Sequence, residues 1–286
     1  MAQNNVFYIA APLIVKVDVD QGDGSFGPLL FPEQTNHGIL IKIDWIQEGN
    51  MAVYKRILLK LSGEALKSGN DLFDFDKVNQ VASIIRKMHD MDVQIGIVIG
   101  AGNIWRGRQG PAANMDAVTA DQMGMLGTVI NCLCVADALR KAGLDAVVQS
   151  AVDMNRFCEP FNAMAARRHL AEGRVVLFAC GTGNPFFSTD SGVALRAIEM
   201  EVDAVLMAKN IDGVYTADPN KDPTATLIKD ITYTEALEKG LKVMDASAFA
   251  LCAENKVPMV RVFGLDDPDN LLRVLEGSDI GTFVHP

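Results

Sequence analysis

The sequence predicts an α/β protein in which a mostly parallel sheet lies between layers of helices. Short apolar runs rich in β-branched residues alternate with longer segments of helical periodicity from Tyr54 onward. Several of these runs end in loops rich in glycine and polar residues, which is where open parallel sheets bind ligands. With 286 residues, 49% of them hydrophobic, the chain is long enough to bury a full core.

The predicted elements alternate along the chain. Strands are predicted at residues 55–61, 93–99, 146–150, 174–180, 204–209 and 259–263. Helices are predicted at residues 76–91, 163–171, 234–239 and 246–255, after Asp190, and after Pro268. One further, long helix is expected to end at Gly143, with Thr119 and Gln122 forming a capping box at its start. This order predicts a three-layer sandwich of helices, sheet and helices.

The first 50 residues differ from the rest in composition. They carry two lysines against six acidic residues and include strand-like runs at residues 6–19 and 38–46. Glycines at 22, 24 and 27 match the GxGxxG spacing, but Pro28 and Pro32 stand where a helix would have to begin, so we interpret this match as a turn. Because Met51 opens a typical start, we expect residues 1–50 to be an appendage or an over-extended reading of the gene. Residues 51–286 are expected to form a single catalytic domain.

Bulk properties exclude several classes of function. The net charge of −10 argues against nucleic acid as a partner, because neutralising phosphodiesters needs a basic surface. The five cysteines include no CxxC pair and fit small core residues of a reducing cytosol. No uninterrupted apolar run reaches the ~20 residues that a membrane span needs. We therefore expect a cytoplasmic protein without a membrane partner.

The stretch GTGNPFFSTD at residues 181–190 joins a strand to a helix and is suited to holding a phosphate. Its two glycines permit close backbone approach, and Asp190 could cap the next helix, whose positive end favours an anion. Hydroxyl donors are supplied by Thr182, Ser188 and Thr189. The alternative is a Gly/Asn/Pro turn without a ligand. The consecutive aromatics after Pro185 favour a pocket, because they are costly to expose in a connecting loop.

Three more polar loops follow strands: KLSGE at residues 60–64, GAGNIWRG at 100–107 and AKNIDGVYTADP at 208–219. Lys60 ends an apolar strand, and the Ser-Gly pair after it suits a cation placed between two phosphates beside backbone amides. Arg106 could reach the same phosphates. The alternatives are an edge-strand lysine that extends to water and a solvated loop arginine. The absence of GxxxxGK[ST] argues against a P-loop kinase.

Six segments together resemble the bacterial uridylate kinases of the amino-acid kinase family. They are KLSGEAL, VIGAGNIWRG, DQMGMLGTVIN, GTGNPFFSTDSGVALRAIE, DGVYTADPNKDPTAT and LKVMDASAFALCAENKVPMVRVF. The similarity extends over about residues 51–285. Acetylglutamate kinases and aspartokinases share the fold but usually carry Gly-Gly after the first lysine, where this chain has Ser62-Gly63.

The resemblance implies transfer of the γ-phosphoryl group of ATP to UMP, giving UDP and ADP in pyrimidine nucleotide biosynthesis. It implies Mg²⁺ as cofactor, ATP and UMP as small-molecule partners, and a homohexamer. No general base is required, because a nucleoside monophosphate already carries a charge of about −1.5 to −2 near neutral pH. Catalysis is then alignment and charge neutralisation by Lys60 and Arg106, with Asp190 orienting the lysine. Asp245 is a weaker candidate as a partner of magnesium or of a lysine.

The resemblance also assigns binding residues. The ATP phosphates would be held by Lys60, Leu61, Ser62, Gly63, Gly102 and Arg106. Adenosine would lie near Lys209, Asn210, Tyr215 and Asp218. UMP would be bound by Ala101, Asp121, Thr182, Gly183, Asn184, Pro185, Phe186, Phe187, Ser188 and Thr189. Ala101 departs from the glycine that is usual in the family, and the residues of a metal site remain unassigned.

Two rival functions remain on the same fold. A non-enzymatic storage protein, like the molybdate-storage relatives of the family, would not need the whole charged set of Lys60, Arg106, Asp121 and Asp190. An amino-acid kinase would have to place a substrate carboxylate where Asp121 stands, and the two charges would repel each other.

Overall fold

The computed structural model describes residues 5–10, 13–18, 52–106, 114–219, 221–241, 244–265 and 267–286. The chain divides into two units, Met1–Gly49 and Asn50–Pro286. In the first unit β1 (Asn5–Ala10) pairs antiparallel with β2 (Leu13–Asp18), so the apolar run predicted at residues 6–19 forms a hairpin. The predicted run at 38–46 and the glycine spacing at 22–27 lie outside the described residues.

The second unit is built on a nine-stranded sheet with the strand order β11-β13-β12-β8-β3-β4-β7-β5-β6. Within the described residues its strands pair in parallel, except that β13 runs antiparallel to β12. The strands are β3 (Arg56–Leu61), β4 (Gln94–Ile99), β5 (Ala146–Ser150), β6 (Glu159–Pro160), β7 (Val175–Ala179), β8 (Ala204–Lys209), β11 (Asp230–Thr232), β12 (Val260–Gly264) and β13 (Thr282–His285). The mostly parallel sheet predicted from the sequence is confirmed.

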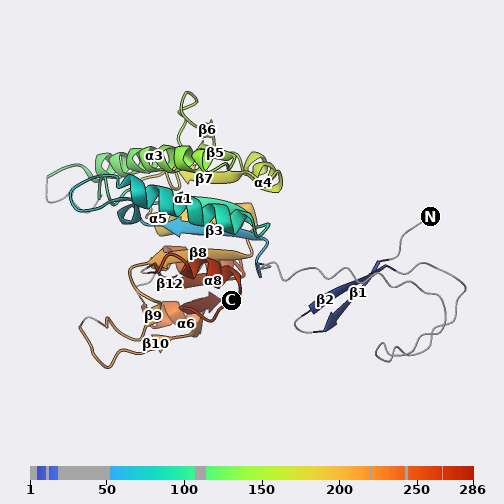
Figure 1. Cartoon of the computed structure of the whole chain (residues 1–286). Helices are drawn as coiled ribbons and strands as arrows, with labels where there is room; N and C mark the ends of the chain where they lie inside the picture. The colour runs from blue at the N-terminus through green and yellow to red at the C-terminus, as the bar shows by residue number, and fades with distance from the viewer. Residues whose placement is uncertain are drawn as a thin grey trace, which may run out of the picture. The chain divides into compact units, whose positions relative to one another are not determined.

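Helices cover both faces of this sheet (Figure 1). One face packs against α1 (Phe75–His89), α3 (Ala117–Lys141) and α8 (Asn270–Leu275). The other packs against α4 (Ala163–Ala171), α5 (Thr189–Met200), α6 (Tyr233–Glu238) and α7 (Ala246–Glu254). A short 3-10 helix, η1 (Gly63–Leu66), follows β3, and a small ribbon of β9 (Val214–Tyr215) and β10 (Leu227–Ile228) follows β8.

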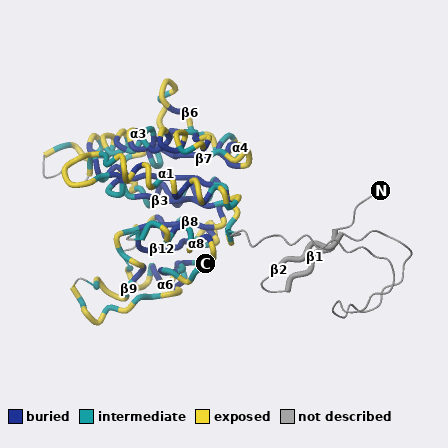
Figure 2. The backbone as a smooth tube through the Cα atoms, in the orientation of Figure 1, coloured by how far each residue is buried: buried dark blue, intermediate teal, exposed yellow. Residues whose placement is uncertain are grey.

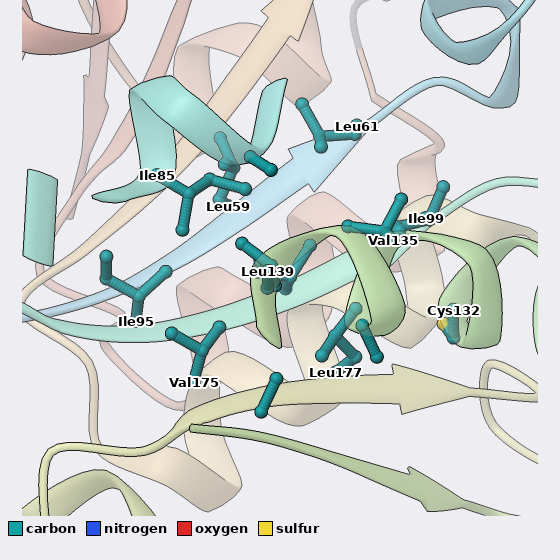
Figure 3. Close-up of a cluster of buried hydrophobic side chains, with 14 of the residues drawn as sticks. Leu59, Leu61, Ile85, Ile95, Ile99, Cys132, Val135, Leu139, Val175 and Leu177 are labelled. Carbon is teal, nitrogen blue, oxygen red and sulfur yellow. The ribbon is translucent and has the colours of Figure 1, made fainter. Parts of the chain in front are cut away.

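The core follows from the alternation of side chains along the central strands. Leu59 of β3 faces the helices α1 and α3, whereas its neighbour Leu58 faces the opposite helix layer. Figure 3 shows Leu59 among side chains of α1 and α3, including Ile85 and Leu139. Because both faces are covered, β7 and β12 are buried along their whole length (Figure 2). This explains why these strands appear in the sequence as continuous apolar runs.

Helix α3 differs from its prediction at its first residue. Asp116 is the N-cap, and its side chain accepts a hydrogen bond from the Thr119 amide at 3.0 Å. The predicted capping box of Thr119 and Gln122 is therefore wrong, because the helix begins three residues earlier than expected. By length and composition α3 is also apolar enough to cross a membrane, with half of its apolar window buried. Core helices of soluble proteins pass the same test, and α3 packs against α1, β5 and β7.

Truncation of a central core residue should destabilise the second unit strongly. Leu59 is fully buried in β3, so Leu59→Ala is expected to lower the free energy of unfolding by about 2–5 kcal/mol. The same change at Leu72, which is 51% exposed, is the matched control and should cost far less. Urea denaturation of both variants measures the difference, and equal losses would contradict the packing described here.

Candidate active site

Four loops emerge together at one edge of the large sheet. The strands β8, β3, β4 and β7 are consecutive neighbours and run parallel, so their carboxyl ends lie side by side. We call the loops after them the β8 loop (residues 208–219), the β3 loop (60–64), the β4 loop (100–106) and the β7 loop (180–190). Residues from the β3, β4 and β7 loops and from helix α3 line a cavity of about 630 Å³. The rule that ligands bind at the carboxyl ends of parallel strands makes this cavity the candidate active site.

Most of the predicted site residues line this cavity. They are Lys60, Ser62, Gly63, Ala101, Gly102, Arg106, Asp121, Thr182, Asn184, Phe187, Ser188 and Thr189. Leu61 instead belongs to the core beneath the sheet edge. Gly183, Pro185 and Phe186 are in the β7 loop without lining the cavity, and Asn210, Tyr215 and Asp218 lie in the β8 loop beside it. The structure thus gathers Lys60, Arg106 and the Thr182 region at one site.

Lys60 is held at the cavity by an ion pair. Its Nζ lies 3.3 Å from Oδ1 of Asp190, and both side chains are mostly shielded from water, with 14% and 16% of their surface exposed. Such a pair is screened far less than one on the open surface. Asp190 stands in the first turn of α5, but it is not the cap that the sequence predicts. Ser188 is the N-cap, because its hydroxyl accepts the amides of Asp190 and Ser191 at 3.1 and 3.2 Å.

A second lysine joins this pair. Burial lowers the pKa of Lys209, the last residue of β8, and the neighbouring Lys60 lowers it further, while Asp190 and Asp245 act in the opposite direction. Two lysines and two carboxylates therefore interact at the ends of β3 and β8. The sequence analysis placed Lys209 with adenosine. Its position beside Lys60 follows from the pairing of β3 with β8, which the sequence does not reveal. Two cations at one point suit a group with several negative charges, such as a phosphate.

Arg106 sits at the rim of the cavity and pairs with Glu64. Its Nη2 donates to Oε1 of Glu64, and its Nε lies 3.4 Å from the carbonyl of Gly102. The hydrogen bond from Arg106 keeps the pKa of Glu64 below its usual value, and Lys67 at 3.2 Å adds to this. Glu64 lies inside the KLSGE motif, but nothing in the sequence indicates that it pairs with an arginine of the β4 loop.

The β7 loop has an unusual backbone conformation that helix α3 supports. Two residues other than glycine have positive φ there, Cys180 at 63° and Phe186 at 69°. This conformation costs energy unless the surroundings fix it. The amide of Cys180 donates to Oγ1 of Thr128 at 2.8 Å, and the amide of Phe186 donates to Oδ2 of Asp121 at 2.8 Å. Both acceptors are on α3, two turns apart, so this helix fixes the start and the middle of the loop.

The alanine at position 101 fits the structure through a neighbouring glycine. A Cβ atom at Gly127 of α3 would lie 2.8 Å from the methyl group of Ala101, so the methyl packs against α3 where Gly127 leaves room. Ala101 is 8% exposed and still lines the cavity. The methyl group therefore occupies space that the missing side chain of Gly127 leaves on α3.

The β8 loop carries polar groups that bond within the loop or to a residue just beyond it. The hydroxyl of Tyr215 donates to Oδ1 of Asp212 at 2.8 Å, and Asp218 forms an ion pair with Lys221 at 3.4 Å. Tyr215 belongs to β9, which pairs with β10 in a short antiparallel ribbon. Among the described residues no cluster of three or more His, Cys, Asp or Glu side chains could hold a metal ion by itself.

Removal of the Thr128 hydroxyl should destabilise the protein through the β7 loop. Thr128→Val is close in shape but leaves the amide of Cys180 without an acceptor, which should cost about 1–3 kcal/mol of unfolding free energy. Thr128→Ser keeps the hydroxyl and should cost clearly less. Thermal or urea unfolding distinguishes the two, and a valine variant as stable as the serine variant would show that this hydrogen bond contributes nothing.

Comparison with known proteins agrees with this geometry. The family model of the amino acid kinase family matches residues 55–262. A uridylate kinase of Nocardioides sp. is 52% identical over 235 residues, which are 82% of this chain and 99% of that protein. The crystal structure of UMP kinase from Bacillus anthracis is similar with a TM-score of 0.78 and 36% identity, covering 81% of this chain and 96% of the other. UMP kinase from Ureaplasma parvum follows with a TM-score of 0.77, 39% identity, and coverage of 81% and 99%. The chain belongs to the amino acid kinase family, on its uridylate kinase branch.

Proposed function

We propose that this chain is a uridylate kinase, which transfers the γ-phosphoryl group of ATP to UMP and gives UDP and ADP in pyrimidine nucleotide biosynthesis. The observation that carries the proposal is the ion pair of Lys60 with Asp190 beside the β7 loop. Lys60 belongs to the β3 loop, which suits a donor phosphate, and its partner Asp190 belongs to the β7 loop, which suits an acceptor phosphate. The similarity to named uridylate kinases supports UMP and ATP as the two nucleotides.

The proposed mechanism relies on alignment and charge neutralisation. The phosphate of UMP is already anionic near neutral pH, so no side chain has to remove a proton from it. Lys60 and Lys209 neutralise the charge on the transferring group, and Asp190 holds Lys60 in position. Arg106 acts from the rim of the same cavity. The three loops that line the cavity also hold the reacting atoms in line, which supplies a large part of the rate.

The two nucleotides are assigned to different loops. The donor phosphates lie along Lys60, Ser62, Gly63, Gly102 and Arg106, and the adenosine lies toward the β8 loop with Asn210, Tyr215 and Asp218. UMP occupies the β7 loop, with Asp121 and Ala101 beside it. The strand order supports this assignment, because β8 and β4 flank β3 on either side and the β7 loop follows beyond the β4 loop.

Magnesium is proposed as the metal cofactor. Mg²⁺ prefers oxygen ligands and is usually held by one or two carboxylates together with substrate phosphates. Asp190 and Asp245 supply carboxylates near the lysines, which fits this mode of binding. When bound, the ion would neutralise and orient the phosphates of ATP.

The assembly and the location are also proposals. A homohexamer in the cytoplasm is consistent with three large apolar side chains exposed along α3, Met123, Leu126 and Ile130, which are 37%, 55% and 49% exposed. Residues 1–50 are proposed to be an extension of a catalytic domain at 51–286. This is supported by the curated relative, which matches 235 residues of this chain with 99% of its own length. An intact N-terminal peptide from residues 1–50, found by mass spectrometry of the native protein, would show that the extension is made.

Turnover with a panel of acceptors tests the function. Purified protein with Mg·ATP should release ADP rapidly with UMP and slowly or not at all with CMP, AMP, N-acetylglutamate and aspartate. Removal of Mg²⁺ by a chelator should abolish the reaction. Binding of nucleotides without ADP release would favour a storage protein, whereas turnover with an amino-acid substrate would favour the other rival.

Substitution of Lys60 tests the mechanism. Lys60→Ala should lower kcat by a factor on the order of 10² to 10³, because it removes one electrostatic contact made to the transferring group. The fold should persist, since the lysine is at the end of β3 and not in the core. Lys87→Ala, on the exposed surface of α1, is the matched control and should keep full activity. Circular dichroism establishes folding, and a near wild-type rate for Lys60→Ala would remove this residue from the mechanism.

A further inference from the structure

We propose that Asn131 of α3 is a positioning residue. Together with Asn103 it holds the β3 and β4 loops in the geometry required for transfer. The inference rests on the proposed function of the cavity. It concerns a residue that does not itself line that cavity, in a helix layer below the reacting groups.

Asn131 and Asn103 form a reciprocal pair of hydrogen bonds. Nδ2 of Asn131 donates to Oδ1 of Asn103 at 2.8 Å, and Nδ2 of Asn103 donates to Oδ1 of Asn131 at 3.0 Å. The remaining protons are also used: Asn131 donates to the carbonyl of Gly100 at 2.8 Å, and Asn103 to that of Leu72 at 2.9 Å. All four amide protons of the pair thus have acceptors, as a buried polar pair requires.

The pair fixes the β4 loop to α3. Gly100 is the first residue of that loop and Asn103 lies in its middle, so Asn131 binds the loop at two points three residues apart. Gly102, which is proposed to hold ATP, lies between these points. The guanidinium of Arg106 follows at the end of the same loop. Movement of Asn131 would therefore shift both groups.

The β3 loop rests on the same amides. A Cβ atom at Gly63 would overlap with Oδ1 of Asn103 and with the carbonyl of Gly100, and would come within 2.9 Å of the amide nitrogen of Gly102. Gly63 is hence in direct contact with the β4 loop, on the side that the amide pair supports. The distance between the β3 loop with Lys60 and the β4 loop with Arg106 is set by this contact.

Asn131 must act through these loops and not on a nucleotide. Its exposed fraction is 0%, and Asn103 is 7% exposed. The β7 loop is held by other residues of α3, Thr128 and Asp121. A change at Asn131 should therefore disturb mainly the donor side of the site, because Ala101 is the one proposed UMP residue that lies between its two contacts.

Asn131→Asp is the sharpest variant because it preserves size while it replaces the amide donor by a carboxylate oxygen. The new oxygen would face the carbonyl of Gly100 and Oδ1 of Asn103, so two attractive contacts become repulsive. We expect kcat to fall about 10- to 100-fold, the effect of a displacement on the order of 1 Å in an aligned site. The KM for UMP should change less than about threefold, since a positioning change of this kind is seen mainly in kcat.

Two further variants make the test decisive. Val135→Ala, one turn along α3, removes a fully buried core side chain and none of the hydrogen bonds to the loops, and should destabilise the protein with kcat within about twofold of wild type. Asn103→Ala removes the partner of Asn131 in the β4 loop and should cause a similar loss of kcat. If Asn131→Asp does not fold, Asn103→Ala takes its place in the test. The kcat of each variant is measured well below its thermal unfolding midpoint and is expressed per folded molecule.

The outcomes separate this inference from the proposed function. A wild-type protein that is folded but inactive on UMP refutes the proposed function. With an active wild type, a twofold or smaller change in kcat for Asn131→Asp and Asn103→Ala overturns the inference. An equal loss of kcat in Val135→Ala also overturns it, because general destabilisation would then explain the effect. A large rise in the KM for UMP at unchanged kcat would show that Asn131 serves the acceptor instead.

Discussion

The parallel pairing of β3 with β8 on one side and β4 on the other is the constraint on which the site depends. In this register Lys60 lies beside Met207 of β8 and Val98 of β4, so the chain leaves all three strands at the same level. Lys60, Lys209 and the β4 loop come together for this reason alone. Because strand pairing is fixed by burial on both faces, a shift of one residue would turn Lys60 toward the opposite face of the sheet.

Helix α3 is the second determinant of the site. Asp121 and Thr128 hold the β7 loop, and Asn131 holds the β4 loop. One rigid element therefore contacts the loops assigned to the acceptor and to the donor. Farther along the same face, α3 packs into the core through Val135 and Leu139 (Figure 3), so the positions of the loops are coupled to the packing of the protein. This arrangement fits a reaction whose rate depends on alignment more than on proton transfer.

Strain and charge are concentrated at the same edge. The positive φ of Cys180 and Phe186 and the cluster of Lys60, Lys209 and Asp190 would each be unfavourable in isolation. The hydrogen bonds from α3 and the compensating carboxylates make them tolerable. A phosphate bound between the lysines would relieve the repulsion between them, so the arrangement of charges favours an anionic ligand.

By itself the sequence determined the layers and the positions of the main strands along the chain. Continuous apolar runs identify buried strands, and glycine-rich loops mark their ends. It also predicted Lys60, Arg106 and the β7 loop as one site, which the structure gathers. Only the tertiary structure decided the pairing of Glu64 with Arg106, the place of Lys209 beside Lys60 and the amide pair of Asn103 with Asn131. The short strands β6, β11 and β13 were equally hidden. These contacts join residues far apart in the chain, and local periodicity carries no information about which distant neighbour a polar side chain will meet.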